Sequence, residues 1–198
     1  MQTAKKSALA RAKWQVRRVL RLICTEAQFG VLYAWHWIMG PPRILSYKYE
    51  TNERLLRAFG AKIGTDVRLL PPITFNLVAH SFANLSIGDH CIINGNTFLD
   101  LSESITLENG ASIGPGVTVM THNRFNRNEF LESRLSLMCG RKPVIIKAGG
   151  NIKANAIILH GVTIGEEAVV AGASVVIKSV PPRHFVSGIP AVTRKVLG

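Results

Sequence analysis

Residues 144–180 read VIIKAGGNIKANAIILHGVTIGEEAVVAGASVVIKSV, and a step of six residues runs through them. Every position on this step is aliphatic: Ile146, Ile152, Ile158, Ile164, Val170 and Val176. A period of six fits neither the 3.6 residues of a helical turn nor the alternation of a plain strand. It fits a coil of short strands that each send one aliphatic side chain inward, so that stacked coils bury an aliphatic column.

The same step occurs upstream with one change of phase. Its members are Ile87, Ile93, Leu99 and Ile105, followed after a shift of two residues by Leu107, Ile113 and Val119. Four residues after each downstream inward position comes a small or β-branched residue that suits a narrow interior: Gly150, Ala156, Val162, Ala168, Ser174 and Val180. At the corners we expect positive φ angles at Gly88, Asn94, Gly114, Gly116, Gly161, Gly165 and Gly172. The sequence therefore predicts a mainly β solenoid.

Charge divides the chain into an extension and a body. Residues 1–60 contain eleven Lys and Arg against three Glu, whereas the repeat occupies residues 61–198, starting near Ile63 and ending in a tail from about residue 181. Residues 8–27 are predicted to form a basic amphipathic helix, and an aromatic cluster follows at residues 33–37. Two interpretations stay open: contact with an anionic membrane through residues 1–40, and a helix that caps the solenoid core.

Composition excludes several other classes of protein. The net charge of +12 favours an anionic partner, but no recognised nucleic-acid-binding motif accompanies it, so nucleic acid is not expected. No uncharged apolar stretch is long enough to span a bilayer. Cys24, Cys91 and Cys139 are odd in number and lack CxxC spacing, which favours reduced thiols. We expect a cytoplasmic protein, with peripheral attachment at the inner face of the membrane as the variant to test.

The segment ITLENGASIGPGVTVMTHN, residues 105–123, resembles the hexapeptide-repeat acyltransferases. The similarity is to the galactoside and maltose O-acetyltransferase branch, which includes acetyltransferases of exopolysaccharides and lipopolysaccharides. It implies a left-handed parallel β-helix of triangular cross-section, acetyl-CoA as co-substrate, and a homotrimer with clefts between subunits. It also implies that His122 is the general base. The loop 123–142 breaks the repeat directly after this histidine, and its length and position favour a functional loop over the alternative of a solvated insertion.

Acyl-transfer chemistry suits a histidine at this position. A sugar hydroxyl must lose its proton as it attacks a thioester, and a neutral imidazole accepts a proton without help from a metal. The sequence shows no spacing of three histidines that would predict a zinc site, so no metal is expected.

The resemblance implies further site residues. In INGNTFLD, residues 93–100, it assigns Asn94 to the active site beside His122; the alternative is a corner asparagine with positive φ. By position, the backbone of Ala154, Ala171, Gly172 and Ala173 would line the pantetheine arm, and Lys178, Arg194 and Lys195 would meet the CoA phosphates. Two departures concern the same region: Asn151 replaces the family's tryptophan, and Lys153 replaces a glycine.

These observations predict an acetyl-CoA-dependent O-acetyltransferase that acts on a sugar hydroxyl by direct transfer in bacterial surface-polysaccharide synthesis. Its acceptor would be a saccharide, lipid-linked in one variant of the hypothesis. Two alternatives remain from the sequence. One is a non-catalytic trimeric scaffold that binds membrane or polysaccharide, and the other is a serine or nucleotide-sugar acetyltransferase.

Overall fold

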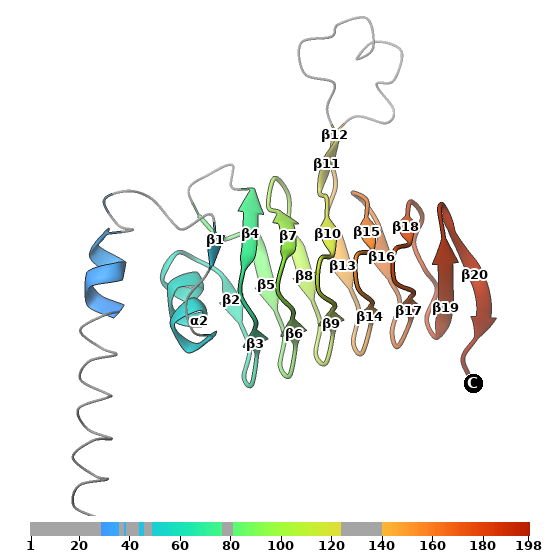
Figure 1. Cartoon of the computed structure of the whole chain (residues 1–198), viewed down its shortest axis with the longest axis horizontal. Coiled ribbons are helices and arrows are strands. Elements are labelled where there is room, and N and C mark those ends of the chain that lie inside the picture. Colours follow the sequence, from blue (N-terminus) through green and yellow to red (C-terminus); the bar gives the residue numbers. More distant parts are fainter. Residues whose placement is uncertain (1–28, 36–37, 39–43, 46–48, 77–80, 124–139) are drawn as a thin grey trace, which may run out of the picture. The chain divides into compact units, whose positions relative to one another are not determined.

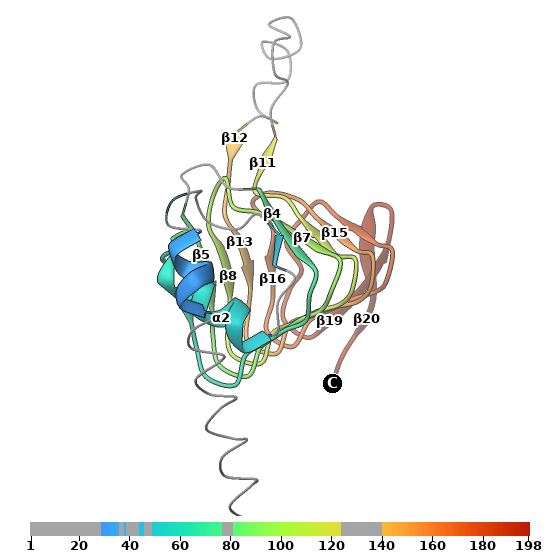
Figure 2. The same ribbon diagram turned by 60° about the vertical axis from the view of Figure 1, so that its left-hand side comes forward.

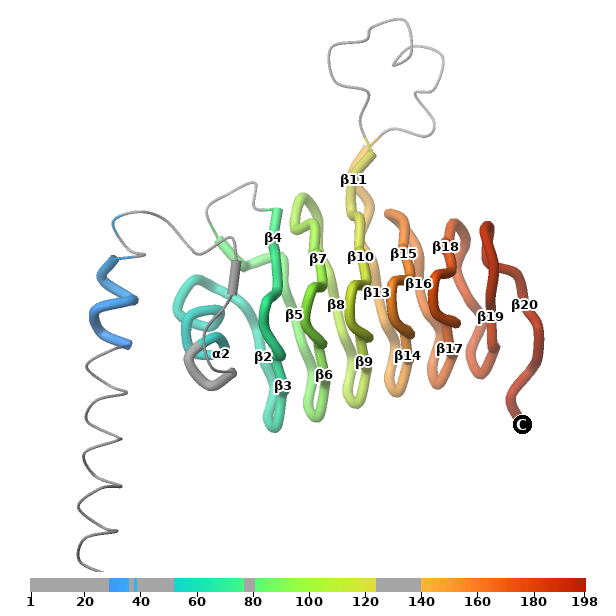
Figure 3. The backbone as a smooth tube through the Cα atoms, in the orientation of Figure 1, coloured from blue at the N-terminus to red at the C-terminus, as the bar shows by residue number. Residues whose placement is uncertain are grey.

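Short strands alternate among three sheets, so that the chain winds as a coil (Figure 1). The computed structural model describes residues 29–35, 38, 44–45, 49–76, 81–123 and 140–198. From β2 onward the chain visits the three sheets in a fixed order, and strands that neighbour each other in a sheet come from successive coils. The tube in Figure 3 shows these coils following one another along a single axis. This parallel β-helix confirms the predicted solenoid.

We name the three sheets A, B and C. Sheet A contains β1 (Ile44–Leu45), β4 (Ile73–Asn76), β7 (Thr97–Asp100), β10 (Thr118–Val119), β15 (Ile157–Ile158) and β18 (Val175–Val176). Sheet B contains β2 (Lys62–Ile63), β5 (Leu85–Ile87), β8 (Ile105–Leu107), β13 (Val144–Ile146) and β16 (Thr163–Ile164). Sheet C contains β3 (Arg68–Leu69), β6 (Ile92–Ile93), β9 (Ser112–Ile113), β14 (Asn151–Ile152), β17 (Val169–Val170), β19 (His184–Gly188) and β20 (Ala191–Val196). Two further strands, β11 (His122–Asn123) and β12 (Gly140–Arg141), pair only with each other.

The aliphatic column forms as the repeat predicts. Every member of the downstream step is buried, from Ile146 at 0% exposure to Val176 at 2%. The upstream members are buried as well, and so are the small residues four positions after each downstream member. Successive coils keep these residues in register, because Val119 pairs with Leu99 on one side and with Ile158 on the other. The turned view in Figure 2 shows the sheets stacked coil behind coil around this core.

The two-residue change of phase falls inside one strand. Ile105 and Leu107 are the first and last residues of β8, and both are buried while Thr106 between them is partly exposed. Side chains two apart on a strand point to the same face, so a shift of two leaves the inward direction unchanged. The repeat therefore continues on both sides of β8 without a break in the core.

The corner prediction was wrong at most of its positions. Of the seven residues, Gly116 and Gly161 have positive φ, at 70° and 77°, and the other five do not. Positive φ occurs in the described chain at seven glycines and at seven residues of other types, the latter being Asp66, His90, Asn96, Asn155, Glu167, Ala173 and Arg183. At Gly114 a Cβ would lie 2.8 Å from Ala154 N and 2.9 Å from Ile152 O. Glycine is required there because the adjacent coil approaches closely, not because of φ.

Helix α2 (Tyr49–Ala58) covers the N-terminal end of the core. Leu55 and Leu56 are fully buried, and Leu56 belongs to the same hydrophobic cluster as the first coil. Arg57 Nη2 donates to Gly64 O at 2.8 Å, which ties the helix to the corner after β2. At the opposite end, the segment predicted as a tail forms the antiparallel hairpin β19–β20. Both ends of the solenoid core are therefore covered by local elements.

Residues 1–40 form a unit of their own. Within it residues 29–35 are helical, and the rings of Phe29 and Tyr33 stack at 6.0 Å. The helix predicted over residues 8–27 and most of the loop 123–142 lie outside the described residues. Among the helices that the structure describes, none has the length and apolarity needed to cross a membrane.

Replacing Ile158 with alanine should lower the free energy of unfolding by about 2–5 kcal/mol, because it opens a cavity in a column with no exposed surface. Ile145 points outward from the middle of β13 in sheet B, where it is partly exposed, and it supplies the matched control. Ile145→Ala should cost about 1 kcal/mol or less. Urea unfolding of the two variants measures the difference, and equal losses would contradict the assigned inward direction.

Candidate active site

His122 lies where the chain leaves sheet A and begins the ribbon β11–β12. Its Nδ1 is 2.5 Å from Oδ2 of Asp100, the last residue of β7. The pairing of β7 with β10 brings the two together, because Leu99 lies beside Val119 and the chain then turns the same corner in both coils. The His122 side chain is 32% exposed, whereas that of Asp100 is fully buried. The Nδ1 edge of the imidazole is thus held by a carboxylate, while the rest of the ring remains accessible.

Asp100 is held by donors on both carboxylate oxygens. Oδ2 accepts the backbone N–H groups of Thr121 at 2.9 Å and His122 at 3.0 Å. Oδ1 accepts Ser102 Oγ at 2.7 Å and Asn76 Nδ2 at 2.8 Å. Burial raises the pKa of Asp100, but the hydrogen bonds from Ser102, His122, Thr121 and Asn76 outweigh burial and hold its pKa well below the usual range. Asp100 is therefore an ionised carboxylate in a fixed position.

This carboxylate decides which nitrogen of His122 carries the proton. An ionised carboxylate accepts hydrogen bonds and donates none, so Nδ1 of His122 must be the N–H donor. In a neutral imidazole Nε2 then has its lone pair free to take a proton. The pair is arranged as a base and the group that orients it.

Asp100 received no role from the sequence, although the repeat contained a signal. Leu99 in β7 and Val119 in β10 both occupy inward positions, and Asp100 and His122 each follow within three residues. Aligning the coils by their inward residues would have placed the two at the same corner. Asp100 was missed because the change of phase at Ile105 and Leu107 obscures that alignment.

The corners form three edges along the solenoid, named by the sheets that they join. Edge AB follows sheet A, and its described residues are 81–84, 100–104, 120–123, 140–143, 159–162 and 177–179. Edge BC consists of residues 64–67, 88–91, 108–111, 147–150, 165–168 and 181–183. Edge CA precedes sheet A and consists of residues 70–72, 94–96, 114–117, 153–156 and 171–174. Sheet A therefore has edge CA along one side and edge AB along the other.

The predicted site residues divide between the two sides of sheet A. Asn94, Ala154, Ala171, Gly172 and Ala173 all lie on edge CA, whereas His122 lies on edge AB. Asn94 does not approach His122 within the chain, since Asn94 precedes β7 and His122 follows β10, the neighbouring strand. Its Nδ2 donates to Ile113 O at 2.9 Å in the adjacent coil. Asn94 also lacks positive φ, which Asn96 adopts instead, so the corner alternative was wrong for this residue.

Hydrogen bonds between coils occupy part of the backbone on edge CA. Ala171 N donates to Val186 O and Ala173 N donates to Ala154 O, each at 2.9 Å. The N–H groups of Ala154 and Gly172 take no part in the backbone bonds between coils within the part of the chain described. Of the four residues predicted to line the donor, these two keep an N–H for a ligand.

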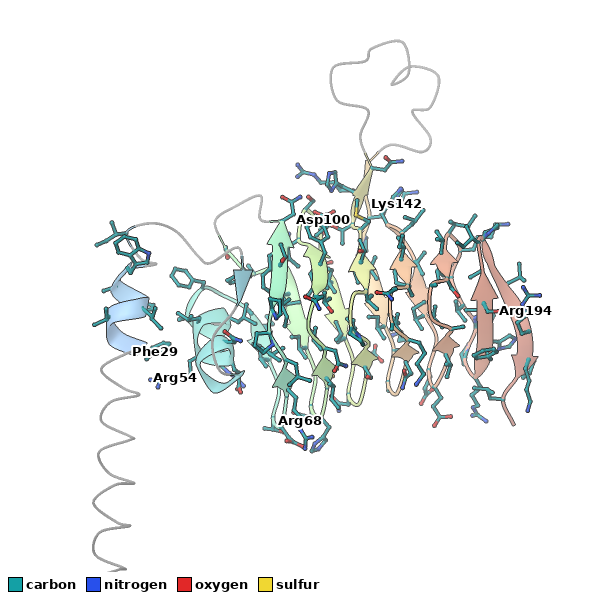
Figure 4. All side chains as sticks on the ribbon, in the orientation of Figure 1. Phe29, Arg54, Arg68, Asp100, Lys142 and Arg194 are labelled. Atoms are coloured by element: carbon teal, nitrogen blue, oxygen red, sulfur yellow. The ribbon has the colours of Figure 1, made fainter. Side chains whose placement is uncertain are left out.

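The predicted basic residues lie in two places. Lys178 is exposed on edge AB, two coils beyond His122, which corresponds to about 10 Å at the usual spacing between strands. Arg194 and Lys195 lie instead on β20 at the C-terminal end of sheet C. Figure 4 shows Arg194 at that end, whereas Asp100 and Lys142 lie near the start of the ribbon β11–β12. Arg194 Nε donates to Ser187 Oγ at 2.9 Å.

Charges separate edge BC from the other two edges. Five of the seven carboxylates on described residues of the solenoid lie on edge BC: Asp66, Asp89, Glu108, Glu166 and Glu167. The remaining two are Asp100 and Glu103 on edge AB. A hollow of about 530 Å³ also lies toward edge BC, around the ion pair of Glu108 with Lys147, and His122 does not line it. We take the dyad rather than this hollow as the candidate active site, since the hollow contains no base held by an orienting group.

No cluster of three metal-ligating side chains occurs among the residues that the structure describes.

Comparison with known proteins identifies the family. No protein-family model matches the sequence. Nodulation protein L of Rhizobium meliloti is 36% identical over 170 residues, which cover 85% of this chain and 88% of that protein. A hexapeptide-repeat acetyltransferase of Vibrio cholerae, solved in complex with acetyl-CoA, is 33% identical with a TM-score of 0.63 and covers 77% of this chain and 80% of its own. The chain belongs to the hexapeptide-repeat acetyltransferases.

A third relative of this acetyltransferase is galactoside O-acetyltransferase of Escherichia coli, 26% identical over 146 residues. The match covers 71% of this chain and 66% of that protein, so the chain spans about two thirds of that relative's length. The family membership confirms the predicted left-handed β-helical fold and the enzyme class. In the acetyltransferase described here, Asn151 faces outward on β14, and Lys153 is exposed on edge CA beside Ala154.

Proposed function

We propose that this acetyltransferase transfers an acetyl group from acetyl-CoA to a sugar hydroxyl, with His122 as general base. The observation that carries the proposal is the His122–Asp100 pair, with Nδ1 of the imidazole bound to a buried, ionised carboxylate. Nε2 takes the proton of the hydroxyl as the alcohol oxygen attacks the thioester carbonyl. The tetrahedral intermediate then collapses, the C–S bond breaks, and the imidazolium returns the proton to the CoA sulfur.

A homotrimer would complete the site. Donor-lining candidates on edge CA and the base on edge AB lie on opposite sides of sheet A, so one chain cannot bring them together. Rotational symmetry that places edge AB of one subunit against edge CA of the next produces equivalent grooves, each with both sets of residues. Three subunits with sheet A facing the axis satisfy this arrangement.

The outer face of sheet A supports such an assembly. Phe98, Ile157 and Val175 occupy one row of outward positions across successive coils, in register with Thr118. Ile157 is 37% exposed, and Ile177, two residues beyond Val175, is 47% exposed. An apolar row on an otherwise hydrated sheet is typical of a surface that is buried in an oligomer.

The charge distribution favours an anionic donor in this groove. Among described residues, the part of the groove beyond His122 carries Lys153 on edge CA and Lys142 and Lys178 on edge AB, while most carboxylates lie on edge BC away from the groove. CoA carries several phosphate charges, which cations along its path would stabilise. Ala154 and Gly172 would donate their N–H groups to the pantetheine arm, with Lys178 near the phosphates and Arg194 and Lys195 as additional cations.

The saccharide acceptor follows from the branch of the family, since one relative is a galactoside O-acetyltransferase. We place the reaction in the assembly of a surface polysaccharide next to the membrane. The supporting observation is the exposure of Val31 at 71%, Trp35 at 59% and Ile38 at 73%, in the segment that follows the basic N-terminal sequence along the chain. Exposed apolar and aromatic side chains next to clustered cations suit an anionic lipid surface.

Acetyl-CoA should bind to the purified protein with measurable heat, and the protein should release free CoA thiol only when a sugar acceptor is added. Titration calorimetry and a thiol-reactive dye, with a panel of neutral and charged monosaccharides and oligosaccharides, make the two measurements. A scaffold would give no heat and no thiol. Lys178→Ala should weaken acetyl-CoA binding about tenfold, whereas Arg183→Ala on edge BC should leave it unchanged.

A further inference from the structure

Arg141 lies directly across the ribbon β11–β12 from His122. The two residues are register partners in the antiparallel pair, as are Asn123 and Gly140. Side chains of directly opposed residues project from the same face of such a pair, with Cβ atoms about 5 Å apart. The guanidinium of Arg141 is therefore carried on the same face as the imidazole that acts as base.

The surrounding described residues leave the Arg141 guanidinium available to bind a ligand. Arg141 is exposed, and no carboxylate among the described residues forms an ion pair with it. Asp100, which contacts His122, is fully buried and already bound through both oxygens. Glu103 directs Oε1 to the backbone N–H of Ser104 at 2.9 Å. The positive charge thus has no internal function that the structure reveals.

The neighbouring Lys142 serves a different part of the edge. Its N–H donates to Thr121 O at 2.9 Å. Its side chain lies against Gly161 in the next coil, where an added Cβ would be 3.0 Å from Lys142 Cδ. Lys142 directly follows Arg141, the last residue of β12, and successive side chains of an extended chain point to opposite faces. Lys142 therefore extends along edge AB toward Lys178, and Arg141 alone of the two shares the face of His122.

The position of Arg141 indicates which of the two substrates it would bind. The thioester must be next to His122 during transfer, and the pantetheine arm then places the CoA phosphates many bonds away, toward Lys178 about 10 Å farther along the edge. An anion bound by Arg141 beside the base would belong to the other substrate. We propose that the acceptor saccharide carries a carboxylate or a phosphate near the hydroxyl that is acetylated, and that Arg141 binds this group.

This inference rests on the proposed transfer at His122 and adds the chemical class of the acceptor. Arginine suits such a role because its planar guanidinium donates two parallel hydrogen bonds to one carboxylate or phosphate. The bound anion would hold the sugar ring so that one hydroxyl faces Nε2 of His122. Arg141 would thus determine which acceptor is used and which of its hydroxyls reacts, without taking part in proton transfer.

The test uses the full-length protein and compares matched acceptors that differ only in the group at C6: methyl glucoside, methyl glucuronide and methyl glucoside 6-phosphate. The wild type should show a kcat/KM for at least one anionic sugar that exceeds the value for the neutral sugar about tenfold or more. Arg141→Gln should lower that value about 10- to 100-fold, which corresponds to one charged hydrogen-bonded contact. Its kcat/KM for the neutral sugar and its Kd for acetyl-CoA should stay within about twofold of the wild type.

Arg183→Gln is the matched control, because Arg183 is an exposed arginine on edge BC beside Glu167. It should leave all three acceptors unaffected. The two anionic sugars distinguish a carboxylate from a phosphate. Equal rates on neutral and anionic sugars, or a preference that survives Arg141→Gln, would overturn the inference while leaving transfer intact. Weaker acetyl-CoA binding in Arg141→Gln would assign the guanidinium to the donor, and failure to acetylate any sugar would reject the proposed function itself.

Discussion

Replacing His122 with alanine is expected to lower the turnover number about 10²- to 10⁴-fold and to leave the Kd for acetyl-CoA nearly unchanged. The rate falls because no other group in the described site stands ready to take the proton of the hydroxyl, while the donor is held mainly by other residues. Steady-state kinetics at saturating acceptor give the turnover number, and calorimetry gives the donor affinity. The imidazole is 32% exposed, so its loss should change the free energy of unfolding little.

His90 supplies a matched control for this variant. It is an exposed histidine that also contacts an aspartate, since its Nδ1 is 3.1 Å from Asp66 Oδ2, but it lies on edge BC. His90→Ala should retain full turnover. If His122→Ala also retained it, the general base would have to be another group.

The His122→Ala variant also tests whether the groove is shared between two subunits. Gly172→Leu should block the donor path on edge CA while leaving His122 intact. If grooves form between edge AB of one subunit and edge CA of the next, mixed oligomers of His122→Ala and Gly172→Leu subunits will contain grooves with both wild-type walls. Activity should then return after the two inactive variants are unfolded and refolded together. No recovery in oligomers shown to be mixed would contradict the shared groove.

Asp100→Asn is expected to lower the turnover number by a similar factor, about 10²- to 10⁴-fold, although the residue touches no substrate in our proposal. An amide in this position would present its NH₂ or its oxygen to Nδ1 of His122. Where the NH₂ faces Nδ1, the proton moves to Nε2 and the base is lost. The acetyl-CoA Kd should remain unchanged, which separates an effect on the imidazole from a collapse of the groove.

The free energy of unfolding provides an independent test of whether Asp100 is ionised in the folded protein. The amide offers donors where the carboxylate offered only acceptors, so Asp100→Asn should lower the free energy of unfolding by about 1–3 kcal/mol near pH 7. Asp100 has a folded-state pKa well below the ordinary value near 3.9. Its stabilising contribution is therefore complete above the ordinary pKa and is lost as the pH falls from there toward the folded-state pKa.

The difference in unfolding free energy between wild type and Asp100→Asn should accordingly be constant from pH 7 to about pH 5.5 and should shrink from about pH 5 to pH 3. Urea titrations at each pH measure it. Asp89→Asn is the comparison variant: hydrogen bonds from Thr65 also lower the pKa of Asp89, but this carboxylate on edge BC is partly exposed, so its difference should be smaller at every pH. A difference that stayed constant down to pH 3 would mean that Asp100 is not held ionised in the folded protein.

The sequence located His122 but not the group that orients it. His122 could be found because it ends a run of regular hexapeptides and precedes a long interruption, both of which are visible in one dimension. Asp100 is 22 residues earlier, and its relation to His122 depends on the stacking of two coils. Asn76, which binds the second oxygen of Asp100 from the preceding coil, depends on stacking as well, whereas Ser102 binds that oxygen from two residues away. The residues that support a site are harder to find than the reacting residue, because they have no chemical signature of their own.

The sequence by itself determined the repeat, the inward aliphatic column from Ile146 to Val176, and the enzyme class that the resemblance implied. Only the tertiary structure showed that most corner glycines are required because adjacent coils approach closely. It also showed that α2 covers the first coil, and that Asn94 and His122 lie on different edges of one sheet. Periodicity reports which side chains a coil buries, because burial alternates along the chain itself. Contacts between coils depend on the number of residues in each corner, and that number varies along this chain. These contacts are therefore determined only when the coils stack.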